Sequence, residues 1–349
     1  MTALLRPAYV LTFREPGTGT GGGAPSGTGT VVDSTTTPGT STVSELRVEL
    51  GMAGAADRVT LAMGQVGSFR PEVGQRLDVA LGYTDGEDPQ QVTTTTIVDT
   101  APDLRTRRVV GHGGAEALLH TRFDRTFEAS TAGAIATELA GAAGVAVAQV
   151  DGGITFPAYV VDARRSAYRH IGELAALCGF DRYVDEQGRL VFAVFTGGRA
   201  SHVFEYGRHI LDLRMDRRPP HATRVTAVGE SPGASRGEHS WAWLAKDLAP
   251  YTGTAGSGAT TLLVERSVLR TASAAQQAAQ AALTELTRGS TVGEVLVTGA
   301  PQVRLGDAVR ISGTPQRGMD GTYQVRSVTH HLRKDSGFRT RIGFRSIES

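Results

Sequence analysis

The chain is short of the residues on which most site chemistry depends. Among 349 residues there is one cysteine, Cys178, so no disulfide can form within a chain and no thiol-rich metal site is possible. Lysine is scarce and aromatic residues make up 6% of the sequence. Neither sign of charge is in excess, with 36 Lys and Arg against 35 Asp and Glu, so no nucleic-acid specificity is expected.

Long apolar runs are also missing. No run reaches the roughly 18 apolar residues that a membrane span needs, so no membrane span is predicted. The first sixteen residues lack a basic start followed by a continuous apolar stretch, and no secretory signal peptide is expected. The single cysteine is consistent with a reducing compartment.

Glycine, by contrast, is abundant at 44 residues, and it separates many short Val- and Thr-rich segments. In these segments apolar and polar residues alternate, the pattern of a strand with one buried face. Many short strands at this spacing are typical of a barrel or a sandwich. The predicted strands cover residues 8–13, 45–50, 58–63, 75–83, 93–98, 202–206, 223–229, 261–264, 292–298, 308–312, 321–330 and 338–344.

One stretch, residues 17–42, is almost entirely Gly, Thr, Ser and Pro. It lacks the apolar side chains that offset the entropy lost on ordering, so a long mobile loop between two strands is the favoured interpretation. A segment that orders against a neighbouring subunit is the alternative. A phosphate-binding loop is disfavoured, because neither a P-loop Lys-Ser/Thr pair nor an apolar helix follows.

Helical signals are confined to the middle of the chain and to one later segment. Ser130 is a candidate cap for a helix over residues 131–140, and Ser166 for a second helix that ends at Cys178 with Gly179 as the stop. A hairpin is predicted next, with strands at 180–184 and 189–195 around a turn at 185–188. A third helix, residues 272–288, is capped by Thr271 and carries a mostly alanine face.

No catalytic or metal-binding pattern emerges from the histidines. They stand at positions 112, 120, 170, 202, 209, 221, 239, 330 and 331, and none falls in a recognised metal-binding spacing. His330 and His331 point to opposite faces of a strand, so we expect one half-buried and one exposed imidazole. His170 lies off the apolar stripe of its helix and is predicted to be on the surface, where Glu173 could pair with it. A catalytic dyad there has no other support.

The remaining candidates favour structural roles as well. Cys178 ends an apolar stripe and is expected to be a small buried hydrophobe. Asp85, Glu87 and Asp88 form an acidic turn that lacks the ligand set of a calcium loop. Trp241 and Trp243 share a face if their segment is a strand, which indicates a packing anchor or, alternatively, a sugar platform. We therefore predict no catalytic, cofactor-binding or metal-binding residues and no cofactor.

Several segments taken in order resemble one protein family, the phage late-control D proteins, which are the baseplate hubs of contractile tails. The N-terminal part of VgrG proteins and the hubs of extracellular contractile injection systems belong with them. The most recognisable stretch runs from Asp162 to Phe180, where a helix ends in Gly-Phe before a hairpin. The other segments that carry the resemblance are residues 45–51, 55–57, 73–83, 190–192, 306–307, 321–325, 328–330 and 337–338.

The resemblance implies an α+β, mainly β fold with two tube-like β-barrel domains. The expected domains are residues 1–108 (with the loop 17–42), a helix-plus-hairpin connecting domain at 109–200, and residues 201–349 with helix 272–288. It also implies a homotrimer that adapts a six-fold tail tube to a three-fold spike. Partners would be the tail tube protein, other baseplate components and a separate spike protein, since the sequence contains no OB-fold or β-helical repeats.

Such a protein would be cytoplasmic during assembly and then part of a virion or injection particle, with no enzymatic activity. Two alternatives stay open from the sequence. One is a hub-associated cell-wall hydrolase, which would need paired carboxylates or a metal set that cannot be assembled from these residues. The other is a carbohydrate-binding β-module that uses Trp241 and Trp243.

Overall fold

The computed structural model describes residues 6–15, 29–35, 43–52, 56–64, 69–84, 88–229, 251–316 and 318–347. These residues form 21 strands and four helices, which confirms the predicted α+β, mainly β class. None of the helices among them is long and apolar enough to cross a membrane.

Thirteen strands from both ends of the chain form one sheet. Its order is β14-β18-β21-β20-β3-β4-β7-β6-β5-β1-β2, and β19 with β13 branches from β20. The N-terminal strands are β1 (Pro7–Arg14), β2 (Thr30–Asp33), β3 (Val43–Gly51), β4 (Arg58–Gly64), β5 (Arg76–Tyr83), β6 (Gln90–Pro102) and β7 (Thr106–Gly113). The C-terminal strands are β13 (Ser201–Glu205), β14 (Ile210–Arg217), β18 (Thr291–Thr298), β19 (Ala308–Ser312), β20 (Gly321–Arg333) and β21 (Gly337–Ser346).

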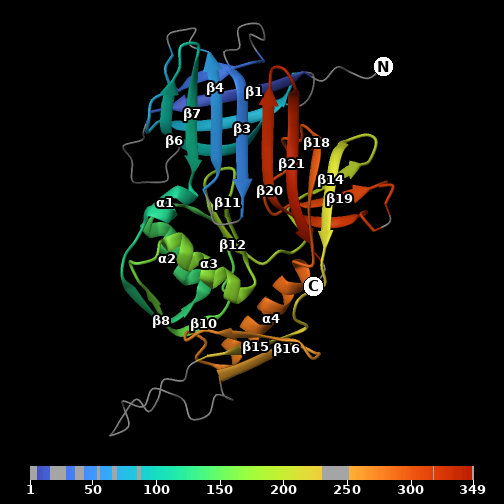
Figure 1. Cartoon of the computed structure of the whole chain (residues 1–349). Helices are drawn as coiled ribbons and strands as arrows, with labels where there is room; N and C mark the ends of the chain where they lie inside the picture. Colours follow the sequence, from blue (N-terminus) through green and yellow to red (C-terminus); the bar gives the residue numbers. More distant parts are fainter. Residues whose placement is uncertain are drawn as a thin grey trace.

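The two halves of this sheet meet at β3 and β20, which pair antiparallel with Val48 opposite His330. Figure 1 shows the N-terminal strands beside β18, β20 and β21, with the helices below them. Within the described residues the strand order ends at β2 and β14 without closing a barrel. The two tube-like barrels are therefore not confirmed, and the proposed domain boundaries stay a prediction.

A bulge in β20 lets this strand serve two partners. Its first part pairs with β19 and its later part with β3, while β21 runs along the other side, and the register shifts between Val325 and Ser327. A bulge adds a residue to one strand and re-aims its side chain. The residue at this bulge is Arg326, and its side chain is directed into the contact with the middle of the chain.

The middle of the chain forms a smaller helix-and-sheet layer. It contains α1 (Ala115–His120), β8 (Arg125–Thr131), α2 (Ala132–Ala142), β9 (Val147–Val150), β10 (Thr155–Val161), α3 (Ala167–Cys178), β11 (Asp181–Val184) and β12 (Leu190–Ala193). Further along the chain, β15 (Arg224–Val228), β16 (Thr252–Gly256), β17 (Thr261–Glu265) and α4 (Ala272–Arg288) return to pack on this layer.

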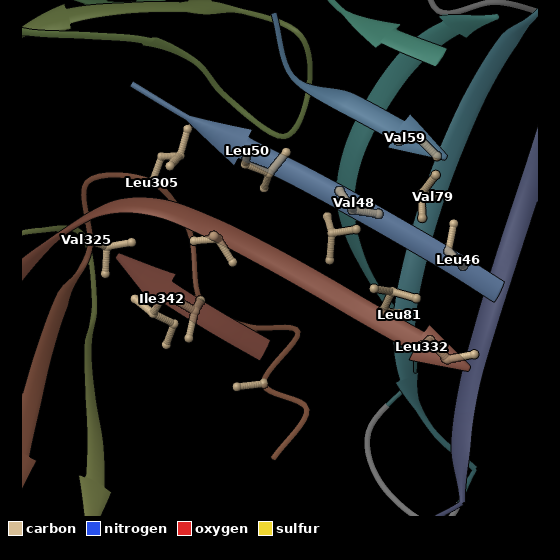
Figure 2. Close-up of a cluster of buried hydrophobic side chains, with 14 of the residues drawn as sticks. Leu46, Val48, Leu50, Val59, Val79, Leu81, Leu305, Val325, Leu332 and Ile342 are labelled. Carbon is tan, nitrogen blue, oxygen red and sulfur yellow. The ribbon is translucent and has the colours of Figure 1, made fainter. Parts of the chain in front are cut away.

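Two hydrophobic cores follow from this arrangement. The first lies on the inner face of the large sheet. Alternate residues of each strand are buried there, because successive side chains in a strand point to opposite faces. Figure 2 draws side chains of this core from several strands, among them Val48 of β3, Val79 of β5 and Val325 of β20. The second core joins α2 and α3 to α4 and includes Val225 and Ala255 from the later strands.

The caps of two predicted helices are confirmed. The Ser166 hydroxyl accepts from the Arg169 amide at the start of α3, and Thr271 accepts from Ala274 at the start of α4. Gly179 ends α3 with φ of 70°, a left-handed conformation that glycine adopts without strain. The hairpin β11–β12 also lies where the sequence placed it.

Three sequence predictions are wrong in detail. The cap of α2 is Thr131 and not Ser130: strand β8 continues through Thr131, whose hydroxyl then accepts from the Ala134 amide. The loop 17–42 contains strand β2, in which Val32 pairs with Leu11, so the two valines at 31 and 32 outweigh the polar composition around them. Strand β8 was missed because Phe127 is its one strongly buried residue, which leaves no alternation to detect.

Candidate functional site

The histidine pair on β20 divides between the two faces of the sheet, as predicted. His330 is fully buried, and its Nδ1 lies 3.0 Å from the Thr340 hydroxyl. Burial lowers the pKa of His330 to about 3. His331 lies on the opposite face, half-buried, with Nε2 2.7 Å from a Glu45 carboxylate oxygen. His330 is thus more buried than predicted, and the two rings share no ligand.

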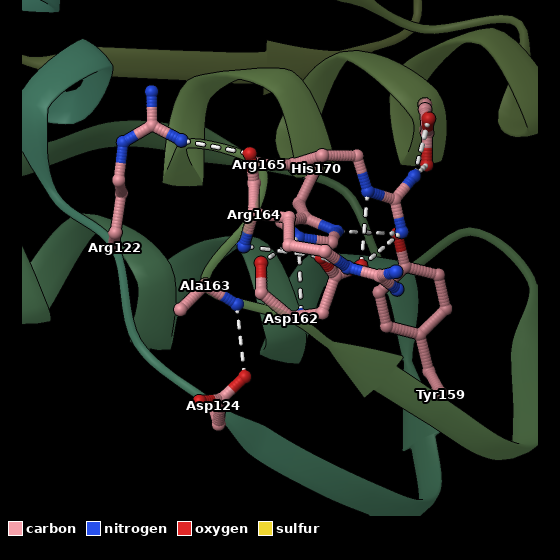
Figure 3. A network of polar contacts seen from close by, with 9 residues as sticks. Arg122, Asp124, Tyr159, Asp162, Ala163, Arg164, Arg165 and His170 are labelled. Atoms are coloured by element: carbon pink, nitrogen blue, oxygen red, sulfur yellow. Dashed lines mark hydrogen bonds and ion pairs between the residues drawn. The ribbon is translucent and has the colours of Figure 1, made fainter.

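His170 is buried, so the prediction of a surface histidine is wrong. Its ring lies between the Tyr159 hydroxyl, 3.4 Å from Nδ1, and the backbone of Asp162, whose amide lies 3.3 Å from Nε2 (Figure 3). Glu173 does not pair with it and binds Arg165 instead. The turn before α3 folds back over the helix and covers a position that helical spacing alone leaves exposed.

The polar network around His170 holds that turn in place. Arg165 donates to both Asp162 and Glu173, and its hydrogen bond holds the pKa of the Asp162 carboxyl below its ordinary value. Arg122 donates to the carbonyl of Arg164, which ties the segment between α1 and β8 to the same turn (Figure 3). Every charge in this network has a protein partner, which is typical of a structural cluster rather than a reactive one.

Cys178 is a packed thiol. Its Sγ accepts a hydrogen bond from the Ile154 amide at 3.4 Å, and burial raises its pKa to about 11. A thiol with a raised pKa is a poor nucleophile at neutral pH. The prediction of a small buried hydrophobe agrees with its place beside the second core.

The other candidates lie apart from one another. His112 pairs with Glu116, and His202 pairs with the buried Asp307 across 2.9 Å. Over the described ranges no three His, Cys, Asp or Glu side chains come together as a metal site would require. His239, Trp241, Trp243, Asp85 and Glu87 lie outside the described residues.

A second polar cluster, partly buried, was not predicted, and it lies where the two cores meet. We call it the joint: Asp181, Glu285, Gln324, Arg326 and Arg345. Asp181 at the start of β11 binds Arg345 across 3.1 Å and is also bonded by Arg326 and Gln324. Arg345 donates to Gln324 at 2.8 Å and to both oxygens of Glu285 on α4.

The joint has no strong sequence signal. Arg345 lies an even number of residues after the exposed Arg339 and Arg341 on β21, so the alternation of a strand predicts that it is exposed too. It is only 6% exposed because β11 and α4 cover the end of β21. A long-range contact of this kind has no local spacing from which it could be read.

Beside the joint lies a groove of about 1030 Å³, bordered by α3, α4, β17 and the segment 218–221. Its walls carry partly buried apolar side chains of the second core, among them Phe180, Leu262, Val264 and Leu286. Five arginines and three carboxylates also line it. It is a large partly apolar surface without any of the acid–base or nucleophile pairs described for catalysis.

The sheet also exposes apolar side chains near its β14 end. Val203, Tyr206 and Leu211 are each more than half exposed and lie on β13, on the turn after it and on β14. An edge strand with exposed apolar residues is a place for pairing with another chain.

Comparison with solved structures shows which proteins share this fold. The 43 kDa tail protein of prophage MuSo2 from Shewanella oneidensis aligns over 97% of this chain and 98% of its own, with a TM-score of 0.68 and 16% identity. A tail protein from Neisseria meningitidis aligns over 97% of each chain, with a TM-score of 0.69 and 13% identity. The chain has the fold of phage tail proteins.

An Escherichia coli component of the type VI secretion system shares this tail-protein fold over 88% of the chain and 74% of its own length. Its TM-score is 0.59 at 9% identity, and it is itself described as similar to tail proteins of bacteriophage T4. No family model matches the chain, and no curated protein matches its sequence. The resemblance to the baseplate hub family is confirmed through fold, at identities too low to carry residue roles.

Proposed function

We propose that this protein is a structural baseplate hub of a contractile tail or injection system. The observation that carries the proposal is the match to two tail proteins, one of them from a prophage, over nearly the full length of all three chains. A match of this extent includes both halves of the large sheet and the helical layer between them. Fold alone is an analogy for function, so the surfaces of this chain have to supply the rest.

In this proposal three copies form a ring that adapts a six-fold tail tube to a three-fold spike. Each chain would supply the two halves of the large sheet, from the proposed domains 1–108 and 201–349, which pair through β3 and β20, together with the connecting residues 109–200. The ends of the strand order at β2 and β14 would be completed by neighbouring copies. The exposed Val203, Tyr206 and Leu211 beside β14 support this, because assembly would cover them.

The proposed role needs no catalysis. The carboxylates of the described part of the chain that lie in clusters are bound by arginines, as in the joint and around Asp162. The partners would be the tube protein, a separate spike protein and other baseplate components. The protein would be cytoplasmic during assembly and then part of a particle.

The mass of the purified chain in solution tests the proposal. Light scattering should give three times the chain mass of 36.7 kDa, alone or when the tube and spike proteins are produced with it. Leu211→Asp should reduce the trimer, whereas Leu263→Asp, at an equally exposed residue of β17, should leave it intact. A monomer under all of these conditions, or release of peptidoglycan fragments by the pure chain, would contradict the proposal.

A further inference from the structure

The groove beside the joint has a geometry that suits a polypeptide. Its volume of about 1030 Å³ is at the upper limit of small-molecule pockets, which range over roughly 300–1,000 Å³. Two helices border it, and they present small side chains to it at the exposed Ala176 on α3 and the partly buried Ala282 on α4. Small residues let another backbone come close, so a third helix can lie across the surface that α3 and α4 share.

One wall of the groove is apolar and is formed by β17 and α4. Helix α4 packs on β15 and β16, while β17 lies at the edge of this small sheet beyond them. Leu262 and Val264 of β17 and Leu286 of α4 are only partly buried, and all three line the groove. An amphipathic helix that laid its apolar face here would complete the second core.

The charged residues that line the groove indicate which charge a bound partner should carry. Each lining carboxylate already has an arginine partner: Glu173 binds Arg165, Glu285 binds Arg345, and Asp181 binds both Arg326 and Arg345. Of the five lining arginines, Arg326 pairs with Asp181, and Arg218 pairs with Asp216. Arg169, Arg182 and Arg266 have no ion-pair partner within the described ranges, so the groove presents uncompensated positive charge around apolar walls.

The groove is also preformed, because several residues that line it are held in place before any partner binds. The Arg182 guanidinium is stacked 4.3 Å from the Tyr168 ring centroid and donates to the Tyr168 carbonyl, and it lies against Gly172. Pro219 and Pro220 stiffen the opposite rim, since their rings fix φ. Groups that are already held in place lose little entropy on binding.

We propose that this groove binds an acidic amphipathic helix of a partner protein, with its apolar face on β17 and α4 and its carboxylates on Arg169, Arg182 and Arg266. The apolar walls favour a peptide over a nucleic acid, whose phosphates would use only the arginines. The proposal is independent of the trimer, because it rests on the groove of a single chain.

A random peptide library displayed on phage and panned against the intact chain tests this directly. Enriched peptides should carry apolar residues at helical spacing with Asp or Glu between them. A labelled synthetic copy of the best peptide should bind at least tenfold more weakly to Ala282→Glu, which fills the groove with a negative side chain. Gln280→Glu, an exposed position on the same helix outside the groove, should bind it as the unaltered chain does.

The arginines are tested with the same peptide. The double variant Arg169→Glu and Arg266→Glu should bind at least tenfold more weakly, while Arg208→Glu and Arg224→Glu, on exposed residues away from the groove, should not. Circular dichroism and the melting temperature establish that each variant is folded. Peptides without acidic residues, or equal binding to Ala282→Glu, would overturn the proposal. So would displacement by single-stranded DNA of equal charge, or loss of self-association in Ala282→Glu, which would assign the groove to a second copy.

Discussion

In the joint the buried Asp181 meets three partners from β20 and β21, one of which is the buried Arg345. Removing one member of a buried ion network leaves the others without compensation in a medium of low dielectric. Arg326, the residue at the bulge, and the buried Arg345 both bind this carboxylate. The joint therefore fixes how the helical layer sits under the large sheet.

Asp181→Ala is expected to lower the free energy of unfolding by about 3–5 kcal/mol, because Arg326 loses its carboxylate partner and the buried Arg345 keeps only the exposed Glu285. Urea unfolding followed by circular dichroism measures the change. The matched control is Asp212→Ala, which breaks an exposed pair with Arg214 and should cost about 0–1 kcal/mol. Equal effects of the two substitutions would contradict a structural role for the joint.

Asp57 and His330 give the chain two opposed dependences on pH. Burial raises the pKa of Asp57 to about 7, although its carboxylate accepts from the Gly51 amide at 3.1 Å. Between about pH 4 and 7 the unfolded chain has lost this proton and the folded chain keeps it, so stability falls as pH rises. His330, with its lowered pKa, works the other way, since stability is lost as pH falls below about 6.5.

Asp57→Asn should therefore remove the decrease in stability with rising pH that Asp57 causes. The increase due to His330 should then be visible from about pH 4 to 6.5. The slope that changes is at most about 1.4 kcal/mol per pH unit. Urea unfolding at a series of pH values measures it. Asp99→Asn, at an exposed carboxylate of the same sheet, should give a profile parallel to that of the unaltered chain. A parallel profile for Asp57→Asn would show that the Asp57 side chain is not buried as described.

At the scale of elements, α4 is distinctive because its alanine face lets β16 come very close. A Cβ added at Gly253 would lie 2.2 Å from the Gln276 amide nitrogen and 2.3 Å from the Ala275 carbonyl carbon. Both contacts are with backbone atoms, which cannot move away by a change of rotamer as a side chain can. The sequence predicted helix α4. It did not predict strand β16, whose close approach requires the small residues of that helix.

Gly253→Ala should consequently separate β16 from α4 and lower the free energy of unfolding by about 1–3 kcal/mol or more. Thermal melting provides the measurement. Gly141→Ala is the matched control, because nothing lies within 4 Å of its added Cβ in helix α2. That substitution should raise stability by about 0.5–1 kcal/mol through helix propensity. A Gly253→Ala chain as stable as the unaltered one would contradict the close approach.

For the whole molecule, β20 is the strand on which the architecture depends. It pairs with β3, β19 and β21, and it connects the N-terminal half of the sheet to the C-terminal half. Central strands open only with the whole fold, while edge strands open locally. Loss of β20 would divide the large sheet and its core in two.

Hydrogen exchange followed by mass spectrometry should therefore find the slowest amides in residues 327–332 of β20. The edge strands β2 and β14, which have one neighbour each in the described sheet, should exchange much faster. The two halves of the sheet should share one slowest rate, because they open together. Slower exchange in the N-terminal strands than in β20 would indicate two independent units instead.

The sequence by itself determined the class of the fold, most strands of the large sheet, the capped helices α3 and α4, and the hairpin between β11 and β12. These features depend on local periodicity and on caps within a few residues, which a single chain displays directly. The resemblance that it carried was confirmed at the level of fold.

Only the tertiary structure decided which strands from the two ends of the chain pair, and it alone revealed the joint and the groove. It also buried His170, which helical spacing had placed on the surface, and Arg345, which lies on the outward parity of β21. The physical reason is that burial depends on contacts outside the local period: the turn at Asp162 covers His170, and Asp181, more than 100 residues away in the sequence, binds Arg345. Periodicity identifies the faces of an element, and packing determines which of them meet water.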